Sequence, residues 1–427
     1  MILPLYIKKT IARVEAFFKG VAFDCRACGQ CVLSNTHLIC PMTCPKGLRN
    51  GPCGGTINGM CEVYPDKECV WIRIYQRISR SKIACPGLNP TPDSALFYTS
   101  SYLNFLSGVD KRGREQLDYL QLGHDRTHQP VQTASRLERQ LKAGKFVKTS
   151  EIRSPRSTDF NAIHREAAFL QDHFDAVNAT ANLNGKPSMP SSRVAAELGR
   201  LGIDAIAQST CRDHTKTTFI SELINNHSNN VHNVLCLTGD SYAGTPKIKQ
   251  VFDMDSSLML YEARYLRETG KIHFTGEETK DVPKPFLGAA INPFTTPANV
   301  PILRLKQKAA AGADFIQTQL IFDLPRFVQF VQEYRDQGLD RDLFLLAGIP
   351  VVTSAQVLAM LPHIPGVHCP EAIMQRLQGA KDLRQEGCLM ARELVEAVRE
   401  IPGINGVHLM LLGSDHSVLP DIISDLD

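Results

Sequence analysis

The chain has 427 residues, and 47 lysines and arginines against 44 aspartates and glutamates give it a net charge of +3. This near-balance excludes the strong basic excess of a nucleic-acid scaffold. Hydrophobic residues make up 43% of the chain and charged residues 21%, which is typical of a globular protein with a real core. No run of about 18 apolar residues occurs, so we expect no membrane span.

The first segment, residues 1–24, places Ile11, Val14, Phe17 and Phe18 at helical spacing. We therefore expect an amphipathic helix that covers the residues following it, in preference to a membrane-surface helix. The segment lacks the long apolar region and the cleavage site of a signal peptide, which favours a cytoplasmic protein.

Nine of the 13 cysteines lie between Cys25 and Cys85. In a cytoplasmic chain such a cluster indicates metal binding before disulfides. The many glycines and prolines around them prevent long helices and strands, so bound metal is the obvious stabiliser of this loop-rich region. The Cys-x2-Cys-x2-Cys run at its start is typical of [4Fe–4S] ligation, with zinc as the alternative. The predicted ligands, enough for two clusters of undecided grouping, are Cys25, Cys28, Cys31, Cys40, Cys44, Cys53, Cys61 and Cys69.

From Ser135 onward the pattern changes to regular alternation. Ser135 and Glu138 have the spacing of a helix-start capping box, and short β-rich runs then alternate with helical stretches. The runs cover residues 146–150, 175–179, 204–209, 233–238, 285–290, 314–319, 343–348 and 406–411. Eight strand–helix units in this length predict a (β/α)8 barrel, and a doubly wound sheet is the alternative. We expect a cysteine module at residues 1–85, a connector at 86–134 and the barrel at 135–427.

Active sites of such barrels lie at the carboxyl ends of the strands. Glu151 follows the first predicted strand, Asp240 follows the fourth, and Asn178 and Gln319 end the second and sixth. Two carboxylates among amides suit proton transfer to nitrogen and recognition of a polar heterocycle. Since no nucleophilic serine or cysteine has an evident partner, we assign the hard chemistry to a cofactor.

The stretch from Phe146 to the C-terminus resembles methylenetetrahydrofolate reductase. The pieces GKFVKTSEIRSPRSTD, DAVNATAN, QSTCRDHTKTT, NVLCLTGD, FLGAAINPF, LKQKAAAGADFIQTQLIFDLPRF, AGIPVV and GVHCPEAI carry the resemblance in order. It implies that Glu151 is the general acid, that Asp240 contacts the pterin and tunes a flavin, and that Gln319 binds substrate. We add Asn178 as a substrate contact. The implied flavin-binding residues are Thr210, Leu237, Thr238, Gly239, Asp240 and Lys308.

The chain departs from this pattern near the flavin phosphates. Gln307 stands where some members have an arginine, and Pro301 stands where some have an acidic ribose contact. These departures imply that the nucleotide part of FAD is held differently or that the cofactor is FMN, with loss of flavin as a further alternative.

The cysteine segments CRACGQC, CPMTCPKGLRNGPCGG and GMCEVYPDKECVW resemble the module known as the methylenetetrahydrofolate reductase C-terminal domain. In related anaerobic systems this module is a partner subunit of the reductase and carries iron–sulfur centres. The resemblance therefore implies a fused protein.

The leading hypothesis is an oxidoreductase of one-carbon metabolism that interconverts 5,10-methylenetetrahydrofolate and 5-methyltetrahydrofolate. Its electrons would come from NAD(P)H, or through the cysteine module from a redox partner protein, and we expect a homo-oligomer. The alternatives are a tetrahydrofolate-dependent methyltransferase and a non-catalytic, zinc-stabilised docking component of a one-carbon complex.

Overall fold

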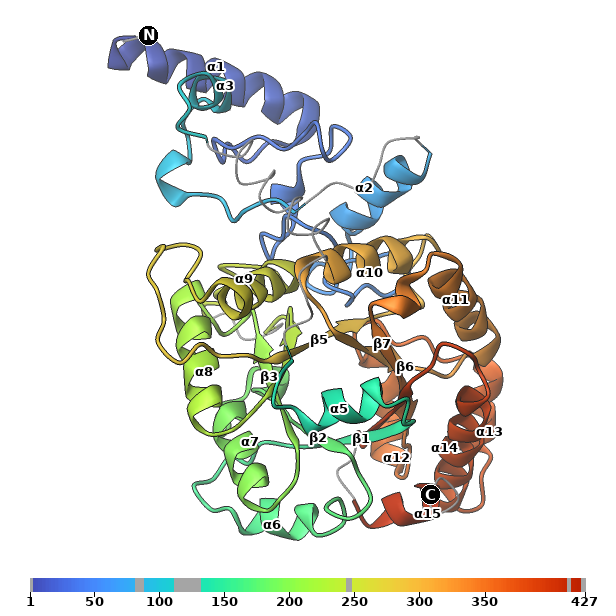
Figure 1. Ribbon diagram of the computed structural model, residues 1–427. Helices are drawn as coiled ribbons and strands as arrows, with labels where there is room; N and C mark the ends of the chain where they lie inside the picture. Colours follow the sequence, from blue (N-terminus) through green and yellow to red (C-terminus); the bar gives the residue numbers. More distant parts are fainter. Residues whose placement is uncertain (1–2, 81–87, 111–131, 243–247, 413–415, 424–427) are drawn as a thin grey trace.

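The structure of the chain is a computed structural model that describes residues 3–80, 88–110, 132–242, 248–412 and 416–423. It consists of a barrel of strands surrounded by helices, with the N-terminal residues stacked on one end of the barrel (Figure 1). Cys85, the last cysteine of the N-terminal group, lies outside the described residues.

Eight parallel strands close into one barrel in chain order, each pairing with its sequence neighbours and β8 pairing with β1. This confirms the predicted (β/α)8 architecture, and the doubly wound alternative is wrong. The strands are β1 (Val147–Ile152), β2 (Ala176–Ala179), β3 (Ala205–Thr210), β4 (Asn233–Leu237), β5 (Phe286–Ile291), β6 (Phe315–Leu320), β7 (Phe344–Pro350) and β8 (Gly406–Met410).

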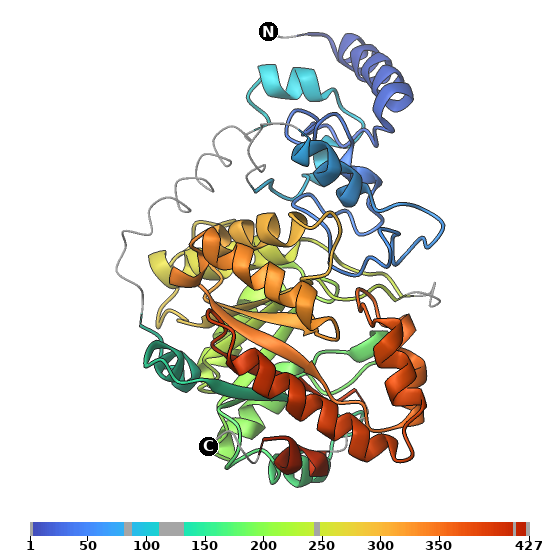
Figure 2. The same cartoon turned by 90° about the vertical axis from the view of Figure 1, so that its right-hand side faces the viewer.

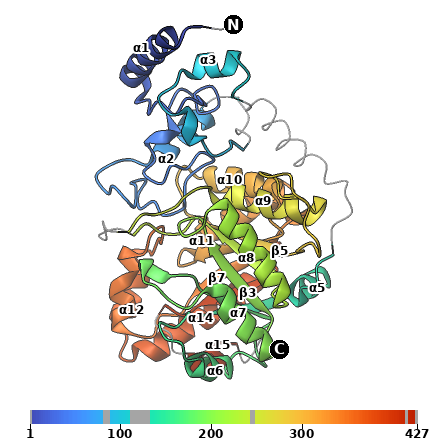
Figure 3. The same ribbon diagram turned by 90° about the vertical axis from the view of Figure 1, so that its left-hand side faces the viewer.

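Helices form an outer layer around the strands, and α7, α8 and α9 cover one side of it (Figure 3). The main apolar core lies between this layer and the strands. The helices of this part are α5 (Arg136–Lys142), α6 (Asn161–Ala167), α7 (Ser191–Arg200), α8 (Lys216–Ser228), α9 (Ser256–Thr269), α10 (Val300–Ala311), α11 (Leu324–Asp336), α12 (Ala355–Met360), α13 (Glu371–Gln378), α14 (Leu383–Arg399) and α15 (Leu419–Ile423).

Residues two apart on each strand face the barrel interior, and along the strand they divide into an apolar layer and a polar one. On β1, Val147 packs in the apolar layer at the amino end, whereas Glu151 reaches a cavity at the carboxyl end. On β6, Phe315 and Gln319 divide in the same way. Leu137 of α5 closes the amino end of the barrel, so only the carboxyl end is open to ligands.

The N-terminal part contains α1 (Leu5–Phe23), α2 (Val70–Ser79) and α3 (Ser101–Leu106) joined by loops. α1 and α3 lie side by side at the end farthest from the barrel (Figures 1 and 2). Trp71 and Tyr75 of α2 form a small separate core that also includes Val300 of α10. The indole Nε1 of Trp71 donates to the carbonyl of Leu48 over 3.0 Å, which ties α2 to the cysteine loops.

The predicted N-terminal helix is confirmed, but the prediction that its apolar residues cover the cysteines is wrong for Val14, Phe17 and Phe18. These three side chains are exposed, and Phe17 is 66% exposed. The face turned toward the module carries Ala12 and the Glu15–Lys19 pair, because Glu15 accepts hydrogen bonds from Ser100 and Ser101 beside α3. Polar contacts thus set the orientation of the helix against its own hydrophobic pattern.

Residues 46–54 of the N-terminal part rest directly on the carboxyl end of the barrel. Lys46 Nζ donates to the carbonyl of Gly239 after β4 over 2.8 Å, and Asn50 Nδ2 donates to Asp255 over 2.6 Å. The carbonyl of Gly54 accepts from Asn292 after β5 over 3.2 Å. The cysteine-bearing loops therefore form part of the barrel mouth.

Residues 88–110 contact the cysteine loops through Tyr98 and Asn104, whose nitrogens donate to the carbonyls of Ala27 and Gly29. The predicted boundaries of the connector, at residues 86 and 134, stay predictions, because residues 81–87 and 111–131 lie outside the described residues. Within the described residues, no helix has the length and apolar character needed to cross a membrane.

Replacing Asn50 by alanine should lower the free energy of unfolding of the full chain by about 1–3 kcal/mol, because Asn50 is 1% exposed and bonds both Asp255 and the carbonyl of Asn89. Thermal unfolding checks this, with the exposed Asn225→Ala as the matched control. Equal melting temperatures for both variants would show that this contact does not hold the module on the barrel.

Candidate active site

One cavity of about 260 Å³ lies at the carboxyl end of the barrel, with residues 52–55 of the N-terminal part in its wall. All nine barrel residues predicted from the sequence line it: Glu151, Asn178, Thr210, Leu237, Thr238, Gly239, Asp240, Lys308 and Gln319. The structure thus brings them together, while their individual roles stay predictions.

Glu151 is the acid–base candidate of this cavity. Burial raises the pKa of its carboxyl group to about 7, although the positive charge of Arg153 acts in the opposite direction. The carboxyl group therefore holds a proton over much of the neutral range, as a general acid requires. Its backbone carbonyl accepts a hydrogen bond from His416 Nε2 over 2.9 Å, which anchors the end of β1.

Two amide side chains cross the barrel and pair with each other. Asn178 Nδ2 donates to Gln317 Oε1 over 2.8 Å, and Gln317 Nε2 donates back to Asn178 Oδ1 over 3.2 Å. Gln319 is held differently, since its Nε2 donates to the carbonyl of Pro365 over 3.1 Å and its Oε1 accepts from the backbone of Leu320. A ligand that uses these amides must exchange at least one of these bonds for its own.

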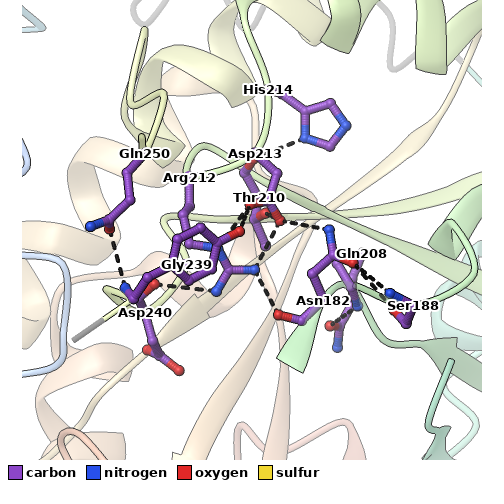
Figure 4. Close-up of polar contacts among 12 residues, drawn as sticks. Asn182, Ser188, Gln208, Thr210, Arg212, Asp213, His214, Gly239, Asp240 and Gln250 are labelled. Atoms are coloured by element: carbon purple, nitrogen blue, oxygen red, sulfur yellow. Dashed lines mark hydrogen bonds and ion pairs between the residues drawn. The ribbon is translucent and has the colours of Figure 1, made fainter. Parts of the chain in front are cut away.

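A polar network behind β3 and β4 positions Asp240 (Figure 4). Arg212 donates to the backbone carbonyl of Asp240 over 3.2 Å and to that of Asn182 over 3.0 Å. Asp213 accepts from Arg212, Thr210 and Tyr242. Although burial opposes it, these hydrogen bonds lower the pKa of Asp213 to about 2. The network fixes the backbone at Asp240 and leaves its carboxylate directed away from the arginine.

Gly239 is required where this network meets the cavity. Its φ of +84° disfavours any residue with a side chain, and an added Cβ would lie 2.9 Å from the Cβ of Arg212. The glycine therefore lets the β4 loop approach the arginine closely.

Sequence reasoning missed several lining residues, among them His408 and Arg304. His408 Nδ1 lies 3.0 Å from Thr149 Oγ1, and burial lowers the pKa of the ring to about 3, so the imidazole is neutral. The inward alternation of the β8 run could have identified His408. Arg304 lies on α10, four residues before Lys308, and only the register of that helix could have identified it.

The eight candidate metal ligands divide into two sets of four. Cys25, Cys28, Cys31 and Cys40 line a cavity under α1. Cys44, Cys53, Cys61 and Cys69 line a second cavity of about 550 Å³. Cys53 also lines the barrel cavity, so the second set borders the candidate active site. In the described parts of the chain, no three cysteine, histidine or acidic side chains are arranged to hold a metal ion.

Residues 136–427 match the family model described as methylenetetrahydrofolate reductase, and residues 6–85 match the model described as methylene-tetrahydrofolate reductase C terminal. The chain is 24% identical to a probable methylenetetrahydrofolate reductase (NADPH) of Caenorhabditis elegans, over 46% of this chain and 28% of that protein. It is 29% identical to methylenetetrahydrofolate reductase (NADH) 1 of Zea mays, over 45% of this chain and 33% of that protein. The chain thus spans a third or less of these two relatives.

The chain is also 23% identical to the 5,10-methylenetetrahydrofolate reductase of Escherichia coli, over 55% of this chain and 72% of that protein. Among solved structures, an uncharacterized protein from Clostridium thermocellum that binds two copies of 5-methyl-5,6,7,8-tetrahydrofolic acid matches with a TM-score of 0.48. The identity is 16%, and the match covers 68% of this chain and 98% of that one.

Glu151→Gln should stabilise the chain in a pH-dependent way. In the wild type, the raised pKa of Glu151 means that stability is lost as pH rises from about 4.5 to about 7, where the buried carboxyl must ionise. The glutamine variant avoids this cost, so its melting temperature should exceed that of the wild type at pH 8 and approach it near pH 4. The exposed Glu396→Gln is the control. A difference between Glu151→Gln and wild type that does not change with pH would contradict the assigned protonation.

Proposed function

Because this chain belongs to the methylenetetrahydrofolate reductase family, we propose that it interconverts 5,10-methylenetetrahydrofolate and 5-methyltetrahydrofolate with a bound flavin. The observation that carries the proposal is the placement of Glu151, protonated near neutral pH, in one cavity with the carboxylate of Asp240. The chemistry needs both an acid and an anion at separate points of one substrate.

In this proposal Glu151 donates its proton to N10 of the folate, which promotes opening of the five-membered ring. The carboxylate of Asp240 accepts hydrogen bonds from the pterin, and Gln319 offers its amide after releasing Pro365. The neutral ring of His408 and the Asn178–Gln317 pair form the polar floor that orients the substrate. When bound, the flavin supplies hydride to the exocyclic carbon.

The cavity fits a flavin in two respects. Leu237, Thr238 and Gly239 form one continuous segment of the cavity wall after β4, with an apolar side chain, a hydroxyl group and bare backbone in succession. Lys308 places its side-chain nitrogen in the wall of the same cavity, where an anionic part of the cofactor would favour the protonated form.

We also propose that the two sets of four cysteines each ligate a [4Fe–4S] cluster. Four thiolates match the ligand number of such a cluster, and the second set lines a cavity of about 550 Å³, whereas the cavity of about 30 Å³ at the first set must widen to admit one. The position of Cys53 in the walls of both cavities supports delivery of electrons from the second set to the barrel. NAD(P)H, named for the C. elegans and maize relatives, is the other donor.

Glu151→Gln should lower turnover of 5-methyltetrahydrofolate, with an artificial electron acceptor, by about 100-fold or more, because Glu151 takes the proton of N10 in this direction and general acid–base catalysis contributes roughly 10²–10⁴ in rate. The flavin content, measured by absorbance, should stay unchanged. Unchanged turnover would remove Glu151 from the mechanism. Methyl transfer from 5-methyltetrahydrofolate to an acceptor, without any change in flavin absorbance, would favour the methyltransferase instead.

Anaerobically purified protein should contain about eight irons per chain, two clusters of four. Cys28→Ser and Cys69→Ser should each remove about half of the iron, because they belong to different sets. Cys369→Ser, on the barrel side of the chain, is the control and should retain all of it. Stoichiometric zinc without iron, or loss of all iron from one single variant, would overturn the two-cluster assignment.

A further inference from the structure

The face of α1 that points away from the cysteine loops carries an apolar stripe. Ile7, Val14 and Val21 are spaced seven residues apart, and Phe17 and Phe18 flank them on the helix surface. Val14 is 50% exposed, Val21 is 78% exposed and each phenylalanine is 66% exposed. A seven-residue repeat of apolar side chains is typical of a helix that pairs with another helix. We name these five residues the α1 seam.

The neighbouring helix α3 enlarges this apolar surface. Tyr102, Phe105 and Leu106 share one face of α3, and each is more than half exposed. A buried aromatic side chain contributes about 150–250 Å², so the exposed parts of these two aromatic residues and of Phe17 and Phe18 come to roughly 400–650 Å². A stable interface buries about 800 Å² on each partner. With their aliphatic neighbours, the two helices therefore offer about the area that a stable dimer needs.

The position and the charges of α1 favour a second copy of this chain as the partner. The helix lies at the end of the molecule farthest from the barrel, so a second molecule can approach it without contact between the two barrels (Figures 1 and 2). The exposed Lys8 and Lys9 lie about a third of a turn away from the middle of the α1 seam. Two copies can therefore pair along the seam without bringing these like charges together.

We propose that the full chain forms a two-fold dimer through the α1 seams of two copies. This specifies the surface of the homo-oligomer expected from the sequence. In a two-fold interface both molecules use the same surface. Val14 is the central residue of the seam, so it faces its counterpart whether the two helices run parallel or antiparallel. The opposite face of α1 lines the cavity of the first cysteine set through Ala12 and Lys19. The paired helices would therefore lie between the first cysteine sets of the two copies.

The test is sedimentation of the full chain at micromolar concentration, without oxygen and with a reductant so that no disulfide links two chains. The wild type should sediment with twice the mass of one chain. Val14→Glu and Val14→Lys each place two like charges face to face at the centre of the interface. Each should weaken the dimer by about 100-fold or more and should sediment as a single chain.

Lys9→Glu is the matched control, because it changes an exposed charge on the same helix away from the seam, and it should stay a dimer. An equal mixture of Val14→Glu and Val14→Lys should recover the dimer, since opposite charges then face each other. Recovery would also show that both variants are folded. The measurement does not depend on bound flavin or iron, so its outcome is separate from that of the proposed function.

A wild type that sediments as a single chain would overturn the proposal. A Val14→Glu variant that stays a dimer would place the interface elsewhere and overturn it as well. A mixture of the two Val14 variants that stays monomeric would contradict the facing of the two Val14 side chains. A single-chain wild type that co-sediments with vesicles of phosphatidylcholine and phosphatidylglycerol would assign the α1 seam to a membrane surface instead.

Discussion

The buried ammonium group of Lys46 joins the N-terminal part to the barrel. Lys46 is 4% exposed, forms an ion pair with Glu62 of its own module and donates to the carbonyl of Gly239 across the interface. Breaking a buried pair from one side costs roughly 3–5 kcal/mol, because the remaining charge is left without compensation. The candidate site depends on this contact, since the loop that Lys46 anchors supplies residues 52–55 of the cavity wall.

Two carboxyl groups at the carboxyl end of the barrel have pKa values shifted in opposite directions, because their surroundings differ. At Glu151, partial burial without a hydrogen-bond donor raises the pKa of the carboxyl group to about 7, whereas Asp213, a few residues past β3, is surrounded by donors and stays ionised. The same strand ends therefore supply both an acid and a fixed anion. The ionised Asp213 positions Asp240 indirectly. It orients Arg212, and Arg212 donates to the backbone carbonyl of Asp240.

The barrel was predictable from the sequence because strand alternation and helix starts are local signals. On β6, the period-2 alternation puts Gln319 on the same face as the core residue Phe315, and Gln319 lies in the cavity wall. Contacts between distant segments have no such signal. The approach of Gly51 to Arg304, the division of the cysteines into two sets, and the outward turn of Phe17 on α1 all depend on which surfaces meet in three dimensions.

Residues 46–54 can contact the barrel only late in the synthesis of the chain. These residues leave the ribosome early, but the barrel that receives them closes only when β8 pairs with β1. At typical synthesis rates of about 5–20 residues per second, the interval between the two events is roughly 20–70 s. During that time the cysteine loops have no barrel beneath them. Their thiols stay exposed to oxidation until the barrel has formed, so the cysteine loops are most vulnerable while the chain is still being synthesised.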